Sequence, residues 1–216
     1  MIDLHIHSIF SDGELIPAEI IQRAEAIGYK ALAITDHADQ SNIDIIIPRI
    51  VKVFREIQPY TSVVLIPGVE ITHVPPEIIP EMAKEARKLG AKLVVVHGET
   101  LVEPVRKGTN IMALQSDIDI LAHPGLITDD EVMEAKNKGI YLEITSRKGH
   151  SLSNGHVVRV ALKHSAKLVI NTDSHSPGDF ISKNFAVKIL KGAGLSEKQT
   201  NEVFKNMKEI VKRKVS

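Results

Sequence analysis

The sequence predicts an α/β protein in which seven parallel strands alternate with helices. Short apolar, β-branched runs recur along the chain, and longer amphipathic stretches separate them. The runs are hydrophobic almost throughout, which is typical of parallel strands that are covered on both faces. Seven such units in 216 residues favour closure into a small barrel over an open doubly wound sheet.

The seven strands are expected where the apolar runs fall. They are residues 1–6, 31–35, 63–69, 92–96, 118–122, 140–144 and 168–171.

Two helices are predicted from their boundary residues. Residues 17–27 begin with a proline and are followed by Gly28, and residues 77–89 are followed by Gly90. Proline suits the first turn of a helix, and glycine suits the residue just after its end.

Two further segments are expected to be helical. Residues 40–59 contain two apolar stretches that Pro48 separates, which indicates a broken helix rather than a linker. Residues 196–216 indicate a final amphipathic helix, with Ser196 and Gln199 as a capping box and basic residues near its far end. No domain boundary stands out, so residues 1–216 are expected to form a single catalytic domain, although two domains remain possible.

Composition excludes several classes of function. The 27 basic and 27 acidic residues balance, so no global positive field is available to hold long nucleic acid. Cysteine is absent, which excludes disulfides, thiolate metal ligands and cysteine nucleophiles. No apolar signal region opens the chain and no stretch is long enough to span a membrane, so a cytoplasmic protein is expected. The composition does not define an oligomeric state.

Polar side chains with metal-binding capacity follow almost every predicted strand. They are His5, His7, Asp36, His37, Glu70, His97, His123, Glu143, Asp173 and His175. The carboxyl ends of parallel strands share one rim, so these side chains are expected to meet there.

The first strand predicts a pair of ligands. His5 and His7 alternate with Leu4 and Ile6, so both imidazoles are expected on one side of the strand and both aliphatic chains on the other. Asp173 repeats this spacing with a histidine two residues later. With no sulfur ligand, zinc, manganese and iron all remain open.

Each residue taken alone has a simpler explanation. A lone histidine at a strand end, such as His37 or His123, is more often a capping or solvated residue than a ligand, and Glu70 alone is compatible with a polar loop start. Six of the ten histidines lie at predicted strand ends, and unrelated capping roles do not explain so many at such positions.

The motifs resemble those of the polymerase and histidinol phosphatase superfamily, the PHP phosphoesterases. DLHIHSIFSDG resembles the first motif of that family, TDH the second and GVE the glutamate motif, and His97, His123 and NTDSH resemble those that follow. The resemblance runs over nearly the whole chain. It implies a distorted seven-stranded (β/α)7 TIM-like barrel and a centre of two or three divalent metal ions.

The resemblance also implies a ligand set. His5, His7, Glu70 and Asp173 hold one ion, and Glu70 bridges to a second ion held by His97 and His123. Asp12, His37 and His175 hold a third. Asp12 stands where some members have a histidine, and it is also compatible with a simple turn before Gly13. Asp36 and Glu143 are expected to orient imidazoles, or else to cap loops.

The expected reaction is hydrolysis of small phosphomonoesters. Two ions sharing Glu70 are expected to hold a bridging hydroxide that attacks phosphorus. Arg147 and Lys148 are the expected phosphate-binding residues, ahead of Arg106 and Lys107, and each is also compatible with an ordinary solvated cation.

The leaving group needs a proton, for which His73 and a metal-bound water are both candidates. His73 is therefore the expected catalytic residue beside Glu70. The expected partner is a small phosphorylated substrate, with no membrane and no long nucleic acid.

Three other functions compete with this one. The first is a nucleotide phosphoesterase or exonuclease, against which stand the absence of a basic stripe and the small number of aromatic residues, five Phe, three Tyr and no Trp. The second is a non-catalytic barrel in a larger assembly, in which decayed ligands are expected. The third is a metal-dependent amidohydrolase, many of which carry a carboxylated lysine where this chain has Glu70.

Overall fold

The computed structural model describes residues 1–215 and contains a sheet made only of parallel strands. The strands are β1 Ile2–Asp3, β2 Ala31–Ile34, β3 His37–Ala38, β4 Val64–Ile71, β5 Leu93–His97, β6 Ile120–Ala122, β7 Tyr141–Thr145 and β8 Leu168–Asn171. Their order is β1-β2-β4-β5-β6-β7-β8, and β3 also pairs with β4. Because β2 and β3 both pair with β4, they are two segments of one interrupted strand. The seven predicted strands are therefore confirmed.

The sheet curls until its first and last strands meet. Ile6 forms an isolated parallel bridge with Ser174, and the amide of His7 donates to the Ser174 carbonyl at 2.8 Å. The amide of Leu4 also donates to Asn171 Oδ1 at 2.9 Å. Because β1 is only two residues long, closure rests on these few contacts, and the barrel is distorted as expected.

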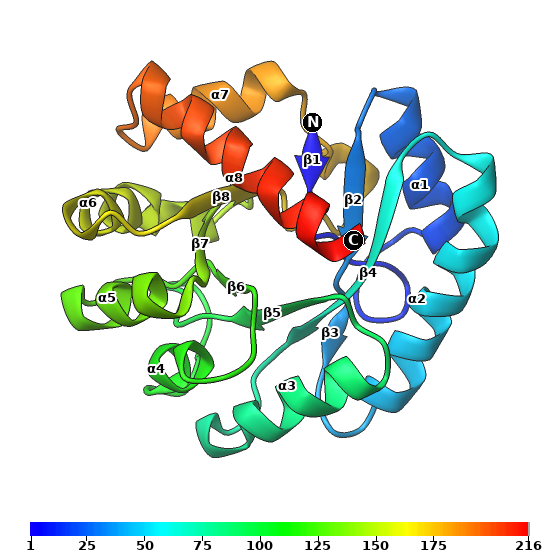
Figure 1. Cartoon of the computed structure of the whole chain (residues 1–216), viewed down its shortest axis with the longest axis horizontal. Coiled ribbons are helices and arrows are strands. Elements are labelled where there is room, and N and C mark those ends of the chain that lie inside the picture. Colours follow the sequence, from blue (N-terminus) through cyan, green and yellow to red (C-terminus); the bar gives the residue numbers. More distant parts are fainter. Residues whose placement is uncertain (216) are drawn as a thin grey trace.

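Eight α-helices accompany the strands within the described residues. They are α1 Pro17–Ala26, α2 Ile43–Ile57, α3 Ile79–Lys88, α4 Thr109–Leu114, α5 Asp129–Lys138, α6 Asn154–His164, α7 Lys183–Gly192 and α8 Glu197–Val215. Helices α1 to α6 surround the outside of the barrel (Figure 1).

Helix α2 runs unbroken through Pro48, so the predicted break is wrong. Proline costs a helix interior about 3 kcal/mol. Ile46, Ile47 and Ile50 are almost fully buried along one face of α2, and burial of each such side chain contributes about 1.5–3 kcal/mol. Packing therefore outweighs the local cost of the proline.

The last helix closes the amino end of the barrel. Met207 and Ile210 of α8 join the cluster of side chains that fills the barrel interior, and Figure 1 shows α8 crossing the strands. Asn206 donates to the carbonyl of Leu168 at the start of β8, and Lys214 pairs with Asp119 just before β6. Helix α8 thus covers the amino ends of the strands and leaves their carboxyl ends open for a site.

The predicted capping box of this helix is confirmed. The amide of Ser196 donates to Gln199 Oε1 at 2.8 Å, and the amide of Gln199 donates to Ser196 Oγ at 3.4 Å. Such a pair satisfies two amides that a helix start leaves free.

One expectation about the first strand is wrong. Leu4 packs in the barrel interior, whereas Ile6 packs in the outer cluster between sheet and helices. Regular strand structure ends at Asp3, so the period of two does not hold over the next residues. Among residues 1–215, no helix is long and apolar enough to cross a bilayer.

Candidate metal centre

All nine residues expected as metal ligands meet at the carboxyl ends of the strands. They form four overlapping groups in which the ligand atoms lie within 4.8 Å of one another. The groups are His7, Asp12, His37 and His175; His5, His123 and Asp173; His5, His7 and Glu70; and Glu70, His97 and His123.

Glu70 on β4 lies at the middle of the centre and is fully buried. Its Oε1 lies 3.3 Å from His5 Nε2 and 3.6 Å from His123 Nε2. Its Oε2 lies 2.7 Å from His37 Nδ1 and 3.7 Å from His7 Nε2. One carboxylate therefore faces imidazoles of three separate groups, as a bridging ligand must.

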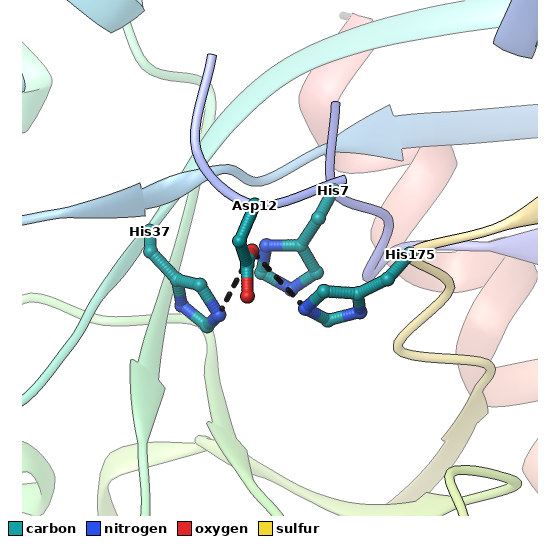
Figure 2. A group of neighbouring side chains, drawn as sticks. All are labelled: His7, Asp12, His37 and His175. Atoms are coloured by element: carbon teal, nitrogen blue, oxygen red, sulfur yellow. Dashed lines mark ion pairs between the residues drawn. The ribbon is translucent and has the colours of Figure 1, made fainter. Parts of the chain in front are cut away.

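Asp12 faces the outer side of the centre. Figure 2 shows its carboxylate between the imidazoles of His37 and His175, with His7 behind. Asp12 Oδ1 lies 3.2 Å from His175 Nε2 and 3.6 Å from His37 Nε2. The next residue, Gly13, has room for no side chain, because a Cβ there would lie 2.4 Å from the carbonyl oxygen of His7. The turn therefore folds back onto the first strand and carries Asp12 to the site.

Buried acceptors fix the direction of two imidazoles. His5 Nδ1 lies 2.8 Å from Glu143 Oε1, and His175 Nδ1 lies 2.9 Å from the carbonyl oxygen of Asp173. Each acceptor takes a hydrogen from Nδ1, which leaves Nε2 with its lone pair directed into the centre. Histidines that bind metal ions are commonly held in this way.

Several buried polar atoms at the centre have no hydrogen-bond partner within residues 1–215. They are His5 Nε2, both ring nitrogens of His7, Glu70 Oε1 and His123 Nδ1. Buried polar groups are almost always satisfied, and an orphaned group indicates a missing ion or water. Imidazole nitrogens and carboxylate oxygens suit divalent transition metals, so these residues fit a cluster of such ions.

The ionisation of the histidines divides into two classes. Burial holds the pKa of His7 and His123 well below its usual range, and nearby imidazoles add to this effect. Burial also lowers the pKa of His5, but Glu143, Glu70 and Asp173 outweigh it and raise the pKa well above the ordinary value. For His37 the carboxylate of Glu70 likewise reverses the effect of burial and raises the pKa.

The carboxylates are also perturbed. Burial raises the pKa of Asp173 to about 7. The pKa of Glu70 is held well below its usual range, because the imidazoles of His5 and His37 outweigh the cost of burial. Hydrogen bonding to His175 and the charge of His37 outweigh burial at Asp12 and lower its pKa to about 2. Strong perturbation of clustered groups is typical of functional sites.

Backbone strain concentrates at the same place. Within residues 1–215, four non-glycine residues have positive φ, namely His73, His123, Ser165 and Asp173. Ser165 caps the end of α6, where this conformation is ordinary. The other three lie at or beside the centre, and strain of this kind is retained where it places functional groups.

Of the two carboxylates expected to orient imidazoles, only Glu143 contacts one. Asp36 accepts hydrogen bonds from the Ser8 amide at 2.6 Å, the Ser8 hydroxyl at 2.7 Å and the Ser11 hydroxyl at 2.8 Å. The expectation that Asp36 orients an imidazole is therefore corrected. Asp36 instead fixes the turn that carries Asp12.

The expected phosphate-binding residues lie in the loop after β7. Arg147 pairs with Asp179 at 3.3 Å, and Asp179 also accepts hydrogen bonds from the amides of His175 and Ser176. The guanidinium is thereby tied to the loop that carries His175. Lys148 beside it is exposed.

Sequence reasoning missed Glu103 as a site residue. Glu103 lies between β5 and α4, with Oε2 3.2 Å from His73 Nε2 and 3.0 Å from His97 Nε2. Burial lowers the pKa of His97, but the hydrogen bond to Glu103 and the charge of Glu70 raise it overall. The pKa of Glu103 is lowered to about 2, chiefly by His97. No strand end marks Glu103 in the sequence, so only the folded loop identifies it.

A cavity of about 420 Å³ opens beside the centre. Asp12, His37, Asp39, His73 and Glu103 contribute to its walls. A larger cavity of about 760 Å³ lies on the outside of the barrel between α2 and α3, away from the ligands. Of these two cavities, the smaller one adjoins the metal-binding groups.

The model of the PHP domain family matches residues 3–211 of the chain. An uncharacterized protein of Methanocaldococcus jannaschii is 48% identical over 214 residues, which cover 98% of each protein. A probable phosphatase of Clostridium botulinum is 26% identical over 241 residues, covering 96% of this chain and 94% of that protein. The DNA polymerase/3'-5' exonuclease PolX of Bacillus subtilis is 25% identical over 195 residues, covering 81% of this chain and 34% of that protein.

Solved structures share the fold. A chain in the cryo-EM structure of archaeal ribonuclease P with mature tRNA has a TM-score of 0.75 at 16% identity, covering 99% of this chain and 91% of that one. A candidate histidinol phosphatase of Listeria monocytogenes has a TM-score of 0.64 at 11% identity, covering 87% of this chain and 99% of that one. At these identities the likeness concerns the fold alone.

Proposed function

The chain belongs to the PHP domain family, and from this membership and its site we propose a metal-dependent phosphoesterase that hydrolyses small phosphomonoesters. The observation that carries the proposal is the position of Glu70. Oε1 of this fully buried carboxylate faces His5 at 3.3 Å and His123 at 3.6 Å, and Oε2 faces His7 at 3.7 Å. Such an arrangement suits two ions that share one carboxylate.

We assign three ion positions from the family resemblance, and the groups of ligand atoms are compatible with them. His5, His7, Glu70 and Asp173 would hold the first ion, Glu70, His97 and His123 the second, and Asp12, His37 and His175 the third. When bound, such ions neutralise phosphate oxygens and lower the pKa of a water that serves as the nucleophile. Glu143 holds the His5 imidazole in the orientation that this ligand set requires.

The chain's own residues bind and orient the phosphate ester. Arg147 offers a planar donor that suits phosphate oxygens, and its pairing with Asp179 holds it near the loop of His175. Lys148 adds a second positive charge from the same loop. Because the net charge of the chain is zero, such local cations supply the positive charge that the protein itself brings to the phosphate.

His73 is the proposed proton donor to the leaving group. It lines the cavity beside the centre, and its Nε2 lies 3.2 Å from Glu103. Histidine is the side chain that most often transfers a proton in catalysis. The cavity, at about 420 Å³, is of a size that suits a small substrate.

Hydrolysis of nucleotides or of short nucleic-acid ends is the second candidate. It is favoured by the relationship to the exonuclease of Bacillus subtilis, of which this chain spans about a third. The chain has few aromatic residues on which bases could stack, with no Trp and three Tyr. This composition favours a substrate other than long nucleic acid.

A non-catalytic barrel that serves an assembly is the third candidate, and the chain in ribonuclease P shares the fold. A purely structural barrel has no use for buried imidazoles that lack partners. Here the unsatisfied atoms of His5, His7 and His123 carry a cost that a metal ion relieves. This energetic cost favours a metal-binding protein over a purely structural barrel.

The proposal is tested by metal analysis followed by a substrate panel. The purified chain, loaded with manganese, zinc or iron, is assayed on p-nitrophenyl phosphate, phosphodiesters, nucleotides and single-stranded oligonucleotides. We expect turnover of phosphomonoesters above that of the other classes. A preference for diesters or oligonucleotides would favour the second candidate, and no bound metal with no turnover would favour the third.

A further inference from the structure

Glu103 gathers three imidazoles around one carboxylate. It lies in the loop between β5 and α4, and its side chain is 37% exposed. Oε2 lies 3.0 Å from His97 Nε2 and 3.2 Å from His73 Nε2, and Oε1 lies 3.3 Å from His150 Nε2. The nine residues of the three ion positions do not include it, although it reaches one of them directly.

The orientation of His97 decides what Glu103 faces. His97 Nδ1 lies 3.1 Å from the carbonyl oxygen of Gly98, which can only accept a hydrogen bond. Nδ1 therefore carries the hydrogen of the neutral ring, and Nε2 presents a lone pair. His97 Nε2 and Glu103 Oε2 then face each other at 3.0 Å, an arrangement that a proton or a metal ion between the two atoms makes favourable.

The distance between these atoms matches that of two ligands on one ion. Ligand atoms at about 2.1 Å from a metal, separated by angles of roughly 90 to 110°, lie about 3.0 to 3.4 Å apart. His97 belongs to the group that it forms with Glu70 and His123. His97 also forms a group with His73 and Glu103 in which all ligand atoms lie within 4.8 Å. His97 is therefore the link between Glu103 and the second ion.

The carboxylate of Glu103 is held in place by its other neighbours. Thr100 Oγ1 lies 2.7 Å from His150 Nδ1, and His150 Nε2 lies 3.3 Å from Glu103 Oε1. If the threonine hydroxyl donates to Nδ1, the hydrogen of His150 is on Nε2 and points at Glu103. Carboxylates that bind metal ions are commonly oriented by such hydrogen bonds.

We propose that Glu103 is a further metal ligand, which binds through Oε2 the same divalent transition-metal ion as Glu70, His97 and His123. The inference rests on the proposed metal centre and adds to it a carboxylate that comes from a loop rather than from a strand end. It gives the second ion four protein ligands, two carboxylates and two imidazoles, where the strand ends supply three. His150 then serves as a positioning residue for Glu103, and His73, the proposed proton donor, contacts the same carboxylate.

The test compares two substitutions that each remove one carboxylate charge from the same cavity. Glu103→Gln removes the proposed ligand. Asp39→Asn is the matched control, because Asp39 lines the cavity and is exposed, while its carboxylate contacts Ser41 rather than an imidazole. Both metal-free variants are first checked for a wild-type thermal unfolding midpoint, and both are then titrated with manganese and with zinc by calorimetry without substrate.

We expect Glu103→Gln to weaken one class of bound ion by roughly 10- to 100-fold and Asp39→Asn to bind like the wild type. In cobalt-substituted protein, Glu103→Gln is also expected to alter the visible absorption bands, which report the ligands of the ion. Wild-type affinity and spectrum in Glu103→Gln, or an equal loss in both variants, would overturn the proposal. Neither measurement uses a substrate, so the result can be interpreted even if the phosphatase proposal fails.

Discussion

His5 Nδ1 lies 2.8 Å from Glu143 Oε1, although 138 residues separate the two in the sequence. Both side chains are fully buried. Glu143 also accepts hydrogen bonds from the amide of His123 at 3.1 Å and from Asn171 Nδ2 at 2.8 Å. One carboxylate on β7 thus holds residues from three other strands or strand ends, and it aims His5 at Glu70.

Replacement of this carboxylate is expected to loosen metal binding. Glu143→Gln keeps the shape of the side chain but removes the charge that holds the hydrogen of His5 on Nδ1. We expect affinity for the ions to fall by about 10- to 100-fold with the fold retained. Calorimetric titration and far-UV circular dichroism measure the two effects. Unchanged affinity would show that the orientation of His5 does not depend on Glu143.

Glu70→Ala tests the shared carboxylate directly. Loss of a ligand that two ions share removes several kcal/mol of transition-state stabilisation, so kcat is expected to fall by about a thousandfold or more. The fold is expected to persist, because the surrounding strands do not depend on this side chain for pairing. Steady-state assays on p-nitrophenyl phosphate measure the effect. Glu81→Ala, at an exposed position on α3, is the control and is expected to match the wild type.

Metal binding is expected to release protons and to strengthen as pH rises. In the metal-free protein the pKa values of His5, His37 and His97 lie above the ordinary value of 6.5. These rings therefore hold a proton more readily than a free imidazole does, and they must lose it before Nε2 can bind an ion. Calorimetry in buffers of different ionisation enthalpy counts the released protons. An affinity that is independent of pH between 6 and 8, with no proton release, would contradict this prediction.

Asp12 is expected to control one ion alone. Asp12→Ala removes the carboxylate that faces His37 and His175, and we expect one bound ion to be lost while the other two remain. Asp12→His supplies another ligand at the same place and is expected to restore that ion. Metal content after gel filtration, measured by plasma mass spectrometry, distinguishes the outcomes. Full metal content in Asp12→Ala would show that Asp12 serves only the turn.

The closing helix is expected to contribute strongly to stability. Ile210 of α8 is fully buried in the barrel interior, and Ile210→Ala is expected to cost about 2–5 kcal/mol of unfolding free energy. Val211→Ala, at a partly buried neighbour, is expected to cost less. Urea unfolding of metal-free protein compares the two. Equal small losses would show that α8 is not an integral part of the core.

Much of the centre was predictable from the sequence because parallel strands end on one rim. Residues as far apart as His5 and Asp173 follow different strands, and the fold class alone brings them together. The final helix was likewise evident from Ser196 and Gln199, because a capping box is a local signal. Both predictions needed only residue type and position relative to an element.

Other features depended on packing that no periodic pattern encodes. Pro48 continues a helix because buried isoleucines on one face outweigh its local cost, and Leu4 turns inward because the first strand ends early. Asp36 and Glu143 were both expected to orient imidazoles, yet of these two only Glu143 meets one.

Glu103 belongs with these features. Its partner His73 lies in the loop after β4, and its partner His150 begins the short 3-10 helix after β7, so the three side chains meet only through the packing of separate connections. The sequence by itself thus determined which strand ends carry side chains able to bind metal, because strand direction is a property of the fold class. The partners of each of these side chains were decided by the tertiary structure, because side-chain contacts depend on how loops and neighbouring strands pack together.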